Sequence, residues 1–289
     1  MRYTVEISVF RDIARAATKA AGLGVGDIDV HAETLELPAW PEALSGLRIA
    51  VIADLHTGSP QVDPERIERI VDRVNAESVD LVGLLGDYID TNVALSEWIA
   101  PETIAARLGR LESWLGTYAV LGNHDWAHAG ARMAKALRDA GITLLENEAV
   151  AVAGSGTPAV GASGPDFWIA GLGDLMRRTA DLEGTLAQVP AGEPVLLFSH
   201  NPDIFPRVPE AVALTLSGHT HGAQVDIPLL RNRLTPSRFG AHYTGGHIEE
   251  GGRHLYVGDG IGTSRLPIRL RAKPELPVLE LRASSSASH

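Results

Sequence analysis

Five short clusters of Asp, Asn and His residues recur along the sequence, and each comes directly after an apolar run. Carboxylate, amide and imidazole groups of this kind bind divalent metal ions and transfer protons. The set contains too much nitrogen for a calcium or magnesium cage, and it suits Mn, Fe, Zn or a mixed pair. The clusters are ADLH (Asp54, His56), GDYID (Asp87, Asp90), GNHD (Asn123, His124, Asp125), SHNPD (His200) and SGHTH (His219, His221).

Each cluster alone has an ordinary structural explanation. A single Asp after a strand is usually a helix cap or a turn residue, and a single His is usually a satisfied surface or core residue. GNHD alone fits a turn, because Asn and Asp tolerate left-handed backbone. The repetition of such clusters after successive apolar runs is not explained in this way. Together they predict one functional site with several metal ligands.

The apolar runs define the elements that must position these clusters. From residue 47 onward they alternate with amphipathic segments, which is typical of βαβ units and a mainly parallel sheet. A helix is expected after the cap residue Asp63, with Ile67, Ile70, Val71 and Val74 as its buried stripe. Further helices are predicted at residues 102–115 and 131–140, and strands at residues 47–53, 79–85, 118–121, 167–170, 195–199, 213–217, 255–257 and 277–281.

The predicted sheet brings the clusters to one place. Ligand sites of open α/β sheets lie beyond the carboxyl ends of the strands, and all five clusters follow a strand there. Two cations about 3.5–4 Å apart polarise a phosphoryl group and generate a hydroxide, and they need a carboxylate between them. Asp87 follows the central strand and is therefore the expected bridge.

Composition limits the classes of function. A chain of 289 residues with 45% hydrophobic residues fits one large α/β domain. The absence of cysteine excludes disulfides, thiolate metal sites, iron–sulfur clusters and a cysteine nucleophile. The formal net charge of -11 argues against a nucleic-acid partner bound through a broad basic surface. It does not argue against a small phosphate ester, because bound cations reverse the local field.

The two ends of the chain are expected to lie outside the main domain. Residues 1–36 are predicted to form an N-terminal helix, at residues 9–21, and a lead-in segment, residues 37–282 the domain, and residues 283–289 a disordered tail. The helix is better explained as a packed or frayed terminal helix than as a membrane-surface helix. No run reaches the roughly 20 apolar residues of a membrane span, and the signal-peptide pattern is missing. Residues 154–164 are rich in Gly and Ser and predict a hairpin loop rather than a phosphate-binding loop.

The ordered motifs resemble a known family. DxH, GDxxD, GNHD, a single His and GHxH, from Asp54 to His221, are similar to the calcineurin-like metallophosphoesterase superfamily. SGHTHGAQVDIPLL, with the later PSRFG, GIGTS and LPIR, resembles a bacterial subgroup of often membrane-associated phosphoesterases that includes UDP-2,3-diacylglucosamine hydrolases. The likeness extends from Leu37 to Leu281. It implies an α/β fold, a four-layer α-β-β-α sandwich of two mixed sheets flanked by helices.

The resemblance also implies roles for the clustered residues. His124 would not be a ligand, but would stabilise the phosphoryl oxygens or protonate the leaving group. Asp90 and Asp125 would orient imidazole rings. Two divalent ions (Mn, Fe or Zn, including a mixed pair) would be held, one by Asp54, His56, Asp87 and His221, and the other by Asp87, Asn123, His200 and His219.

Two departures from the subgroup stand out. Ala223 occupies a position where the subgroup usually has Gly, and its methyl group is expected to narrow the approach to the metals. The N-terminal transmembrane helix of many relatives is missing, which puts membrane residence in doubt.

Several charged or aromatic residues lie outside the matching motifs. Surface or loop positions are the default for His128, His242, His247 and His254, with His242 and Tyr243 as candidates for the pocket mouth. Arg177 and Arg178 fit a solvated helix start better than a grip on substrate phosphate.

The activity implied is hydrolysis of a phosphodiester or pyrophosphate bond by in-line attack of metal-bound hydroxide. The substrate would be a lipid-linked or other small phosphoester, and no nucleic acid is expected as a partner. A phosphomonoesterase or phosphoprotein phosphatase is the alternative; a non-catalytic scaffold is less favoured because every ligand and His124 are present. The expected location is the cytoplasm, with or without peripheral contact to the inner membrane. The native metals and the oligomeric state stay open.

Overall fold

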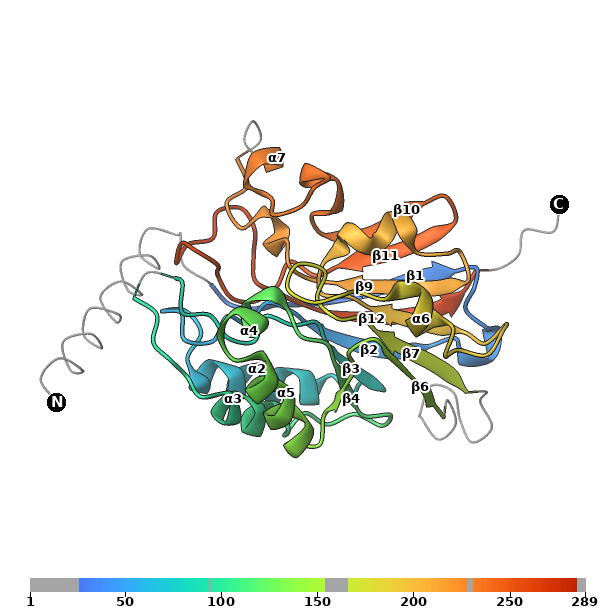
Figure 1. Ribbon diagram of the computed structural model, residues 1–289, viewed down its shortest axis with the longest axis horizontal. Coiled ribbons are helices and arrows are strands. Elements are labelled where there is room, and N and C mark those ends of the chain that lie inside the picture. The colour runs from blue at the N-terminus through green and yellow to red at the C-terminus, as the bar shows by residue number, and fades with distance from the viewer. Residues whose placement is uncertain (1–25, 94, 154–165, 228–230, 285–289) are drawn as a thin grey trace, which may run out of the picture.

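The computed structural model describes residues 26–93, 95–153, 166–227 and 231–284 (Figure 1). The helix predicted at residues 9–21 and the loop predicted at residues 154–164 lie outside these ranges. Of the predicted tail, only residues 283 and 284 are described. Within the described part of the chain, no helix is both long and apolar enough to cross a membrane.

Two mixed sheets form the centre of the protein (Figure 1). The first has the order β1-β12-β2-β3-β4-β5, with β1 Asp29–Leu37, β12 Glu275–Ala283, β2 Leu47–Ile52, β3 Leu81–Leu84, β4 Thr117–Ala119 and β5 Thr143–Leu144. The second has the order β10-β11-β9-β8-β7-β6, with β10 Gly246–Glu250, β11 Arg253–Val257, β9 Val212–Ser217, β8 Val195–Phe198, β7 Phe167–Gly171 and β6 Glu148–Val152.

The strands that precede the motif clusters run parallel in both sheets. β2, β3, β4 and β5 are parallel neighbours in the first sheet, and β7, β8, β9 and β11 are parallel neighbours in the second. The antiparallel pairs are β12 with β2, β6 with β7 and β10 with β11. The parallel core of each sheet therefore directs its carboxyl ends to one edge, as the sequence pattern predicts.

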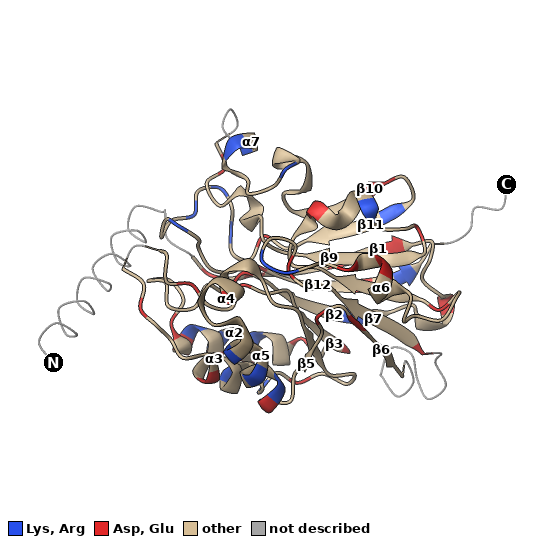
Figure 2. Cartoon of the chain, viewed as in Figure 1, with Lys and Arg blue, Asp and Glu red and all other residues tan. Residues whose placement is uncertain are grey.

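Helices cover the outer face of each sheet. α2 (Pro64–Ala76), α3 (Pro101–Leu108) and α5 (Gly130–Asp139) pack on the first sheet and carry acidic and basic side chains on their outer surfaces (Figure 2). α6 (Leu182–Leu186) and the 3-10 helix η2 (Pro202–Arg207) pack on the second. The predicted start of α2 is confirmed, because the Asp63 side chain accepts a hydrogen bond from the Arg66 N–H at 2.7 Å. Its predicted buried stripe is confirmed as well.

The apolar core has three layers, one between the two sheets and one between each sheet and the helices that cover it. In β2, Ala50 and Ile52 pack with the helices, whereas Ile49 and Val51 pack between the two sheets. Leu197 of β8 lies in the third layer, under α6 and η2. This alternation places one layer between the sheets and one under each set of helices. The predicted four-layer α-β-β-α sandwich is confirmed.

Some elements differ from the prediction. β1 was not predicted. It pairs in parallel with β12 along its whole length, and all of it except Leu37 precedes the predicted start of the domain at residue 37. Leu35 and Leu37 of β1 are buried. The helix predicted at residues 102–115 ends at Leu108, because the chain turns at Gly109. β5, β6, β10 and α6 were also not predicted.

Candidate metal centre

The structure brings all seven predicted ligands to the carboxyl edge of the two sheets. Asp54 and His56 follow β2, Asp87 follows β3, and Asn123 follows β4 as the first residue of α4 (Asn123–His128). From the second sheet, His200 follows β8, and His219 and His221 follow β9. The candidate site therefore lies between the sheets, and both sheets contribute predicted ligands.

The backbone conformation at the strand ends orients these side chains toward one another. The loops after β2 and β3 stay hydrogen-bonded beyond the strands, with the His56 N–H donating to the Asp87 carbonyl at 2.9 Å. A Cβ at Gly122 would overlap the Asp87 carboxylate, so the loop after β4 can approach only with glycine there. Left-handed φ angles in non-glycine residues cluster at functional sites, and five ligands have them: Asp54 (52°), His56 (45°), Asp87 (56°), His219 (72°) and His221 (55°).

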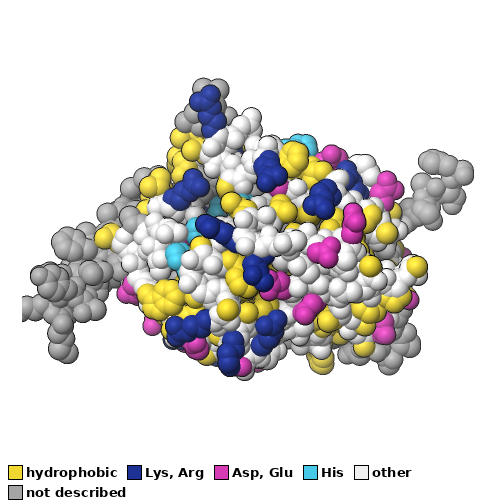
Figure 3. Space-filling view, in the orientation of Figure 1, with side chains coloured by type: hydrophobic (Ala, Val, Ile, Leu, Met, Phe, Trp, Pro, Cys, Tyr) yellow, Lys and Arg dark blue, Asp and Glu magenta, His cyan; other side chains and the backbone are white. Residues whose placement is uncertain are grey.

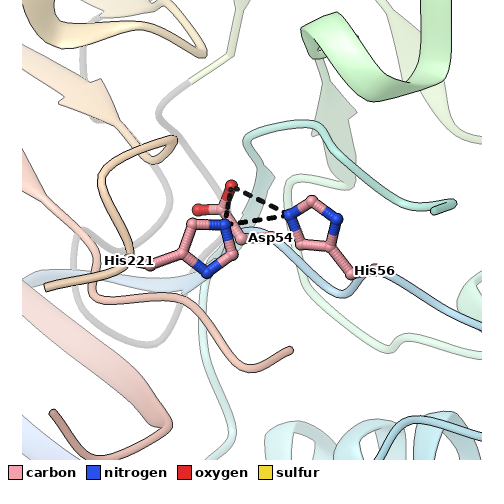
Figure 4. Close-up of side chains that lie close together, drawn as sticks. All are labelled: Asp54, His56 and His221. Atoms are coloured by element: carbon pink, nitrogen blue, oxygen red, sulfur yellow. Dashed lines mark hydrogen bonds and ion pairs between the residues drawn. The ribbon is translucent and has the colours of Figure 1, made fainter. Parts of the chain in front are cut away.

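Asp54, His56 and His221 form the first group of donors (Figure 4). The two Nε2 atoms of the histidines lie 2.9 Å apart. Asp54 Oδ1 lies 3.6 Å from His221 Nε2 and 3.9 Å from His56 Nε2. Asp87 Oδ2 lies 3.6 Å from the same His56 atom. All four side chains are buried.

Asp87, Asn123, His200 and His219 form the second group. Asp87 Oδ2 lies 3.3 Å from His200 Nε2, and Asn123 Oδ1 lies 3.3 Å from that same nitrogen. His219 Nδ1 lies 3.2 Å from it. One oxygen of Asp87 is thus near the nitrogens of both groups, which is the position that a bridging carboxylate needs.

The donor atoms fit divalent metal ions. Ligands about 2.0–2.2 Å from a common ion stand about 3–4 Å from one another. The distances given above, from 2.9 to 3.9 Å, fall in or close to this range. Four buried imidazoles converge here on two carboxylates and one amide oxygen, a set that would be costly to bury without compensating charge or hydrogen bonds. Nitrogen and oxygen donors of this kind suit Mn, Fe or Zn.

Hydrogen bonds fix the imidazole rings. Asp90 Oδ2 lies 3.1 Å from His56 Nδ1, and the Leu85 carbonyl oxygen lies 2.7 Å from His200 Nδ1. Both contacts leave Nε2 directed at the other donors. The expected orienting contact of Asp90 is therefore present in the structure.

Asp125 makes different contacts from those expected. Its carboxylate accepts backbone N–H bonds from Asp87 (2.8 Å), Tyr88 (2.9 Å) and Gly122 (2.9 Å), and a longer one from Ile89 (3.3 Å). It contacts backbone amides where an imidazole was expected, so it fastens the loop after β3 to the start of α4. Burial, and then the charge of Asp87, raise the pKa of Asp125 to about 7.

His124 lies beside the donor groups and faces the pocket. Its Nδ1 is 3.3 Å from Asp90 Oδ2, and its backbone N–H donates to Asp87 Oδ1 at 2.8 Å. Its ring centroid is 4.8 Å from that of His56. The side chain is 18% exposed, whereas that of His56 is fully buried. His124 can therefore meet a substrate that His56 cannot reach.

His128 was not assigned to the site from the sequence. It lies on α4, four residues after His124, and its Nε2 is 3.5 Å from Asp90 Oδ1. The spacing is a usable signal, because residues four apart share one face of a helix. Asp90 is consequently shared by three histidines: His56, His124 and His128.

The electrostatics of the site favour positive charge beside the carboxylates. Burial alone would raise the pKa of Asp87, but the charge and hydrogen bond of His200 outweigh it and hold that pKa well below its ordinary value. Burial alone would lower the pKa of His200, but Asp87 raises it to about 10. Burial, together with the charge of His200, lowers the pKa of His219 to about 3. A positive charge is thus favoured on His200 next to Asp87, and it is disfavoured on His219.

A pocket of about 190 Å³ opens above the donors. Asp87, Asn123, His124, His219 and His221 line its floor, and its walls include Met176, Ala223, Gln224, Val225, Leu234, Pro236, Ser264, Arg265 and Leu266. Figure 3 shows histidine side chains reaching this face of the protein, with hydrophobic and basic side chains beside them.

Other expectations about the pocket have mixed outcomes. His242 and Tyr243 are not among its described lining residues; Tyr243 is buried, with its ring 5.7 Å from that of Phe205. Arg177 and Arg178 do not line it either, and the Arg178 guanidinium stacks 4.4 Å above the Trp126 ring. Ala223 is buried, lines the pocket and has a φ of 66°, a conformation that favours glycine.

Comparison with known proteins agrees with this geometry. The family model described as calcineurin-like phosphoesterase matches residues 47–223. The chain is 32% identical over 260 residues to the uncharacterized metallophosphoesterase YkuE of Bacillus subtilis, covering 89% of this chain and 87% of that protein. It is 32% identical over 286 residues to the phosphodiesterase YaeI of Escherichia coli, covering 93% and 96%. It is 28% identical over 272 residues to a transmembrane protein with metallophosphoesterase domain of Danio rerio, covering 89% of this chain and 57% of that protein.

These matches span the strand-end clusters, and the structure brings the clusters together as groups of side chains that could hold metal ions, with Asp54, His56 and His221 in one and Asp87, His200 and His219 in another. Two further such groups include His124. The chain therefore belongs to the calcineurin-like phosphoesterases and is a metal-dependent phosphoester hydrolase.

Proposed function

We propose that the chain hydrolyses phosphodiester or pyrophosphate bonds at a dinuclear metal centre. The observation that carries the proposal is the position of Asp87 Oδ2, which lies 3.6 Å from His56 Nε2 in one donor group and 3.3 Å from His200 Nε2 in the other. A carboxylate oxygen shared in this way supports two ions held close together.

The ligand sets proposed from the residues are consistent with the distances. One ion would be held by Asp54, His56, Asp87 and His221, and the other by Asp87, Asn123, His200 and His219. Mn, Fe and Zn fit these donors, alone or as a mixed pair. Ions bound there would supply Lewis acidity and a hydroxide nucleophile for in-line attack on phosphorus.

His124 is proposed as the group that acts on the substrate directly. Its Nδ1 lies 3.3 Å from Asp90 Oδ2, and the ring lines the pocket. From that position it stabilises charge on the phosphoryl oxygens or gives a proton to the leaving oxygen. Asp125 would act through the backbone, by holding Asp87 and the start of α4 in place.

A diester or diphosphate substrate is favoured over a monoester. The name phosphodiesterase of the YaeI relative supports a diester. Exposed apolar side chains at the pocket, Met176, Leu234 and Leu266, support a substrate with an apolar part, such as a lipid-linked phosphoester. The net charge of -11 disfavours a nucleic acid.

Metal analysis followed by three assays tests the proposal. Metal content per chain is measured on purified protein, and turnover is compared for bis-p-nitrophenyl phosphate, p-nitrophenyl phosphate and a UDP-diacylglucosamine after loading with Mn, Zn or Fe. We expect two metal ions per chain and faster hydrolysis of the diesters. Faster hydrolysis of the monoester would favour the phosphatase alternative, and a metal-loaded protein without turnover on any of the three would favour a scaffold.

A further inference from the structure

One loop beside the metal pocket contains Arg265, which lies between the motifs GIGTS and LPIR. The proposed metal ligands give this segment no role. This rim loop, residues 262–273, follows β11 and precedes β12. Its residues Ser264, Arg265 and Leu266 line the same pocket as Asp87, His124 and His221. The rim loop therefore forms a wall of the pocket whose floor is the candidate metal centre.

Gln224 holds the pocket side of the rim loop. Its Oε1 accepts from the Ser264 N–H at 2.7 Å, and its Nε2 donates to the carbonyl oxygens of Leu266 (2.9 Å), Ile268 (3.0 Å) and Ser264 (3.1 Å). Gln224 follows His221 by three residues, so the segment that presents a metal donor also fixes this loop. The positions on both sides of Arg265 are thereby set.

Arg269 holds the far side of the rim loop from inside the protein. It is buried, and its guanidinium donates to the carbonyl oxygens of Gly262 (2.9 Å), Asp259 (2.8 Å) and Lys273 (3.3 Å). These bonds join the two ends of the loop. With Gln224, they make the rim loop a rigid support for the side chains at its tip.

Arg265 stands at that tip in a strained conformation. Its φ is 63°, a region that costs an L-residue conformational energy and that favours glycine. Its side chain is exposed, and no hydrogen bond or ion pair of its guanidinium is found with any described residue. A strained residue at a functional pocket is a candidate for a role in function. Arg271 has the same φ, so what distinguishes Arg265 is its place in the lining of the metal pocket.

Arg265 also differs in charge from its surroundings. Among the described residues that line the pocket, it alone carries a permanent positive charge. A guanidinium is planar and binds phosphate oxygens through two parallel N–H bonds. An unpaired Arg on a rigid wall of a phosphoester pocket is therefore suited to bind an anionic group.

We propose that Arg265 binds a second phosphate of the substrate, next to the phosphate that is hydrolysed. This inference rests on the proposed function, and it narrows the substrate class to diphosphate diesters. Leu234 and Leu266, which are exposed at the same pocket, would contact the substituent beyond the second phosphate.

The chain contains a matched control for Arg265. Arg271 lies in the same loop, is also exposed and has the same φ of 63°, but it lines a different pocket with residues 26–29. Arg265→Gly and Arg271→Gly remove the same charge and relieve the same backbone strain. Thermal unfolding should show that both variants fold and are at least as stable as the parent chain.

The test compares two substrates in the metal-loaded full chain. UDP-glucose supplies a diphosphate diester, and bis-p-nitrophenyl phosphate supplies a diester with one phosphate. We expect Arg265→Gly to raise KM for UDP-glucose about tenfold more than KM for bis-p-nitrophenyl phosphate, as expected for a lost charge-assisted hydrogen bond. Arg271→Gly should change neither by more than about twofold, and Arg265→Lys should recover part of the loss.

Equilibrium binding separates this inference from the proposed function. If the parent chain hydrolyses neither substrate, the proposed function fails, and calorimetric binding of UDP-glucose to the metal-loaded protein still tests Arg265. Binding that weakens in Arg265→Gly and not in Arg271→Gly supports the inference. Equal effects on both substrates, equal effects of both variants, or a parent chain that does not bind UDP-glucose would overturn it.

Discussion

Asp87 makes more contacts with the site than any single motif suggests. Its Oδ2 lies between His56 and His200, while its Oδ1 accepts the backbone N–H of His124. Its own N–H donates to Asp125, and its φ is 56°. Such a conformation persists only when surrounding bonds determine it. The residue is therefore held in place from several directions before any ion binds.

Asp87→Ala tests the bridge. Because one oxygen of Asp87 serves both donor groups, the variant should lose most of both ions and nearly all turnover. His56→Ala is the comparison, since His56 belongs to one group and should lose chiefly one ion. Metal content per chain, measured by elemental analysis at a fixed free metal concentration, distinguishes the two. Retention of two ions by Asp87→Ala would refute the bridge.

His124→Asn separates catalysis from metal binding. The side chain faces the pocket beside the donor groups, so the variant should keep its metal content while kcat falls by about 10²–10⁴, the usual contribution of a positioned acid or base. The loss should shrink for nitrophenolate leaving groups if His124 acts as the acid, and persist if it stabilises phosphoryl charge. A fall in bound metal that matches the fall in activity would make His124 a ligand or a support.

At the scale of elements, β1 shows how the ends of the fold are joined. It pairs with β12 from Asp29↔Glu275 to Leu37↔Ala283, and it forms the edge of the first sheet. Leu35 and Leu37 are buried in the layer between the sheets, whereas Glu36 is exposed. The start of the domain should accordingly include this strand.

Leu35→Ala and Leu37→Ala should each lower the free energy of unfolding by about 2–5 kcal/mol, the usual cost of truncating a buried Leu. Glu36→Ala should change it by less than about 0.5 kcal/mol, because its side chain points to solvent. Urea unfolding of the three variants provides the measurement. Losses below about 1 kcal/mol for both leucine variants would show that the domain does not depend on β1, and would favour the boundary at residue 37.

Local signals explain which elements could be predicted. One short segment contains all the signals for α2. Asp63 and Pro64 mark its start, and the spacing of its apolar residues predicts its buried face. β1 has only a short alternation at its end, TLEL, and the prediction did not use it. Its partner β12 lies at the far end of the chain, so the pairing could not be predicted from a local segment. α4 is too short to show a helical period, so GNHD alone fitted a turn.

Some features of the candidate site could likewise be predicted from local sequence signals, and others could not. The convergence of the seven candidate ligands could be predicted because their residue types recur after strands, where the fold must bring them together. The contacts of Asp125 with backbone amides could not, since those amides lie on another loop. Nor could the proposed role of Arg265, because its φ and the lack of a guanidinium partner among the described residues are properties of the folded loop rather than of any motif.

At the scale of the whole molecule, the metal donors join the two sheets. Asp54, His56, Asp87 and Asn123 come from the first sheet, and His200, His219 and His221 from the second. The apolar layer between the sheets lies behind these loops, and the open edge is occupied by carboxylates and imidazoles. Asp87 and His200 attract each other across this edge, whereas burial, and then the charge of His56, lower the pKa of His221, so that a positive charge on His221 is disfavoured. Bound ions would therefore connect the sheets where apolar packing does not.

Removal of the metal should in consequence destabilise the whole fold. An ion that binds only the folded chain adds about 2.7 kcal/mol when its free concentration is a hundredfold above its Kd, so the melting temperature should fall after treatment with a chelator and recover when Mn or Zn is restored. Asp87→Ala, which should not hold the ions, is the control, and its melting temperature should not depend on metal. Hydrogen exchange should show the loss of protection first in the loops after β3, β8 and β9. If stripped and loaded protein melted at the same temperature while metal analysis confirmed binding, the ions would not link the sheets. Apolar packing and direct contacts such as the His219 N–H bond to Asp54 would then hold the sheets together.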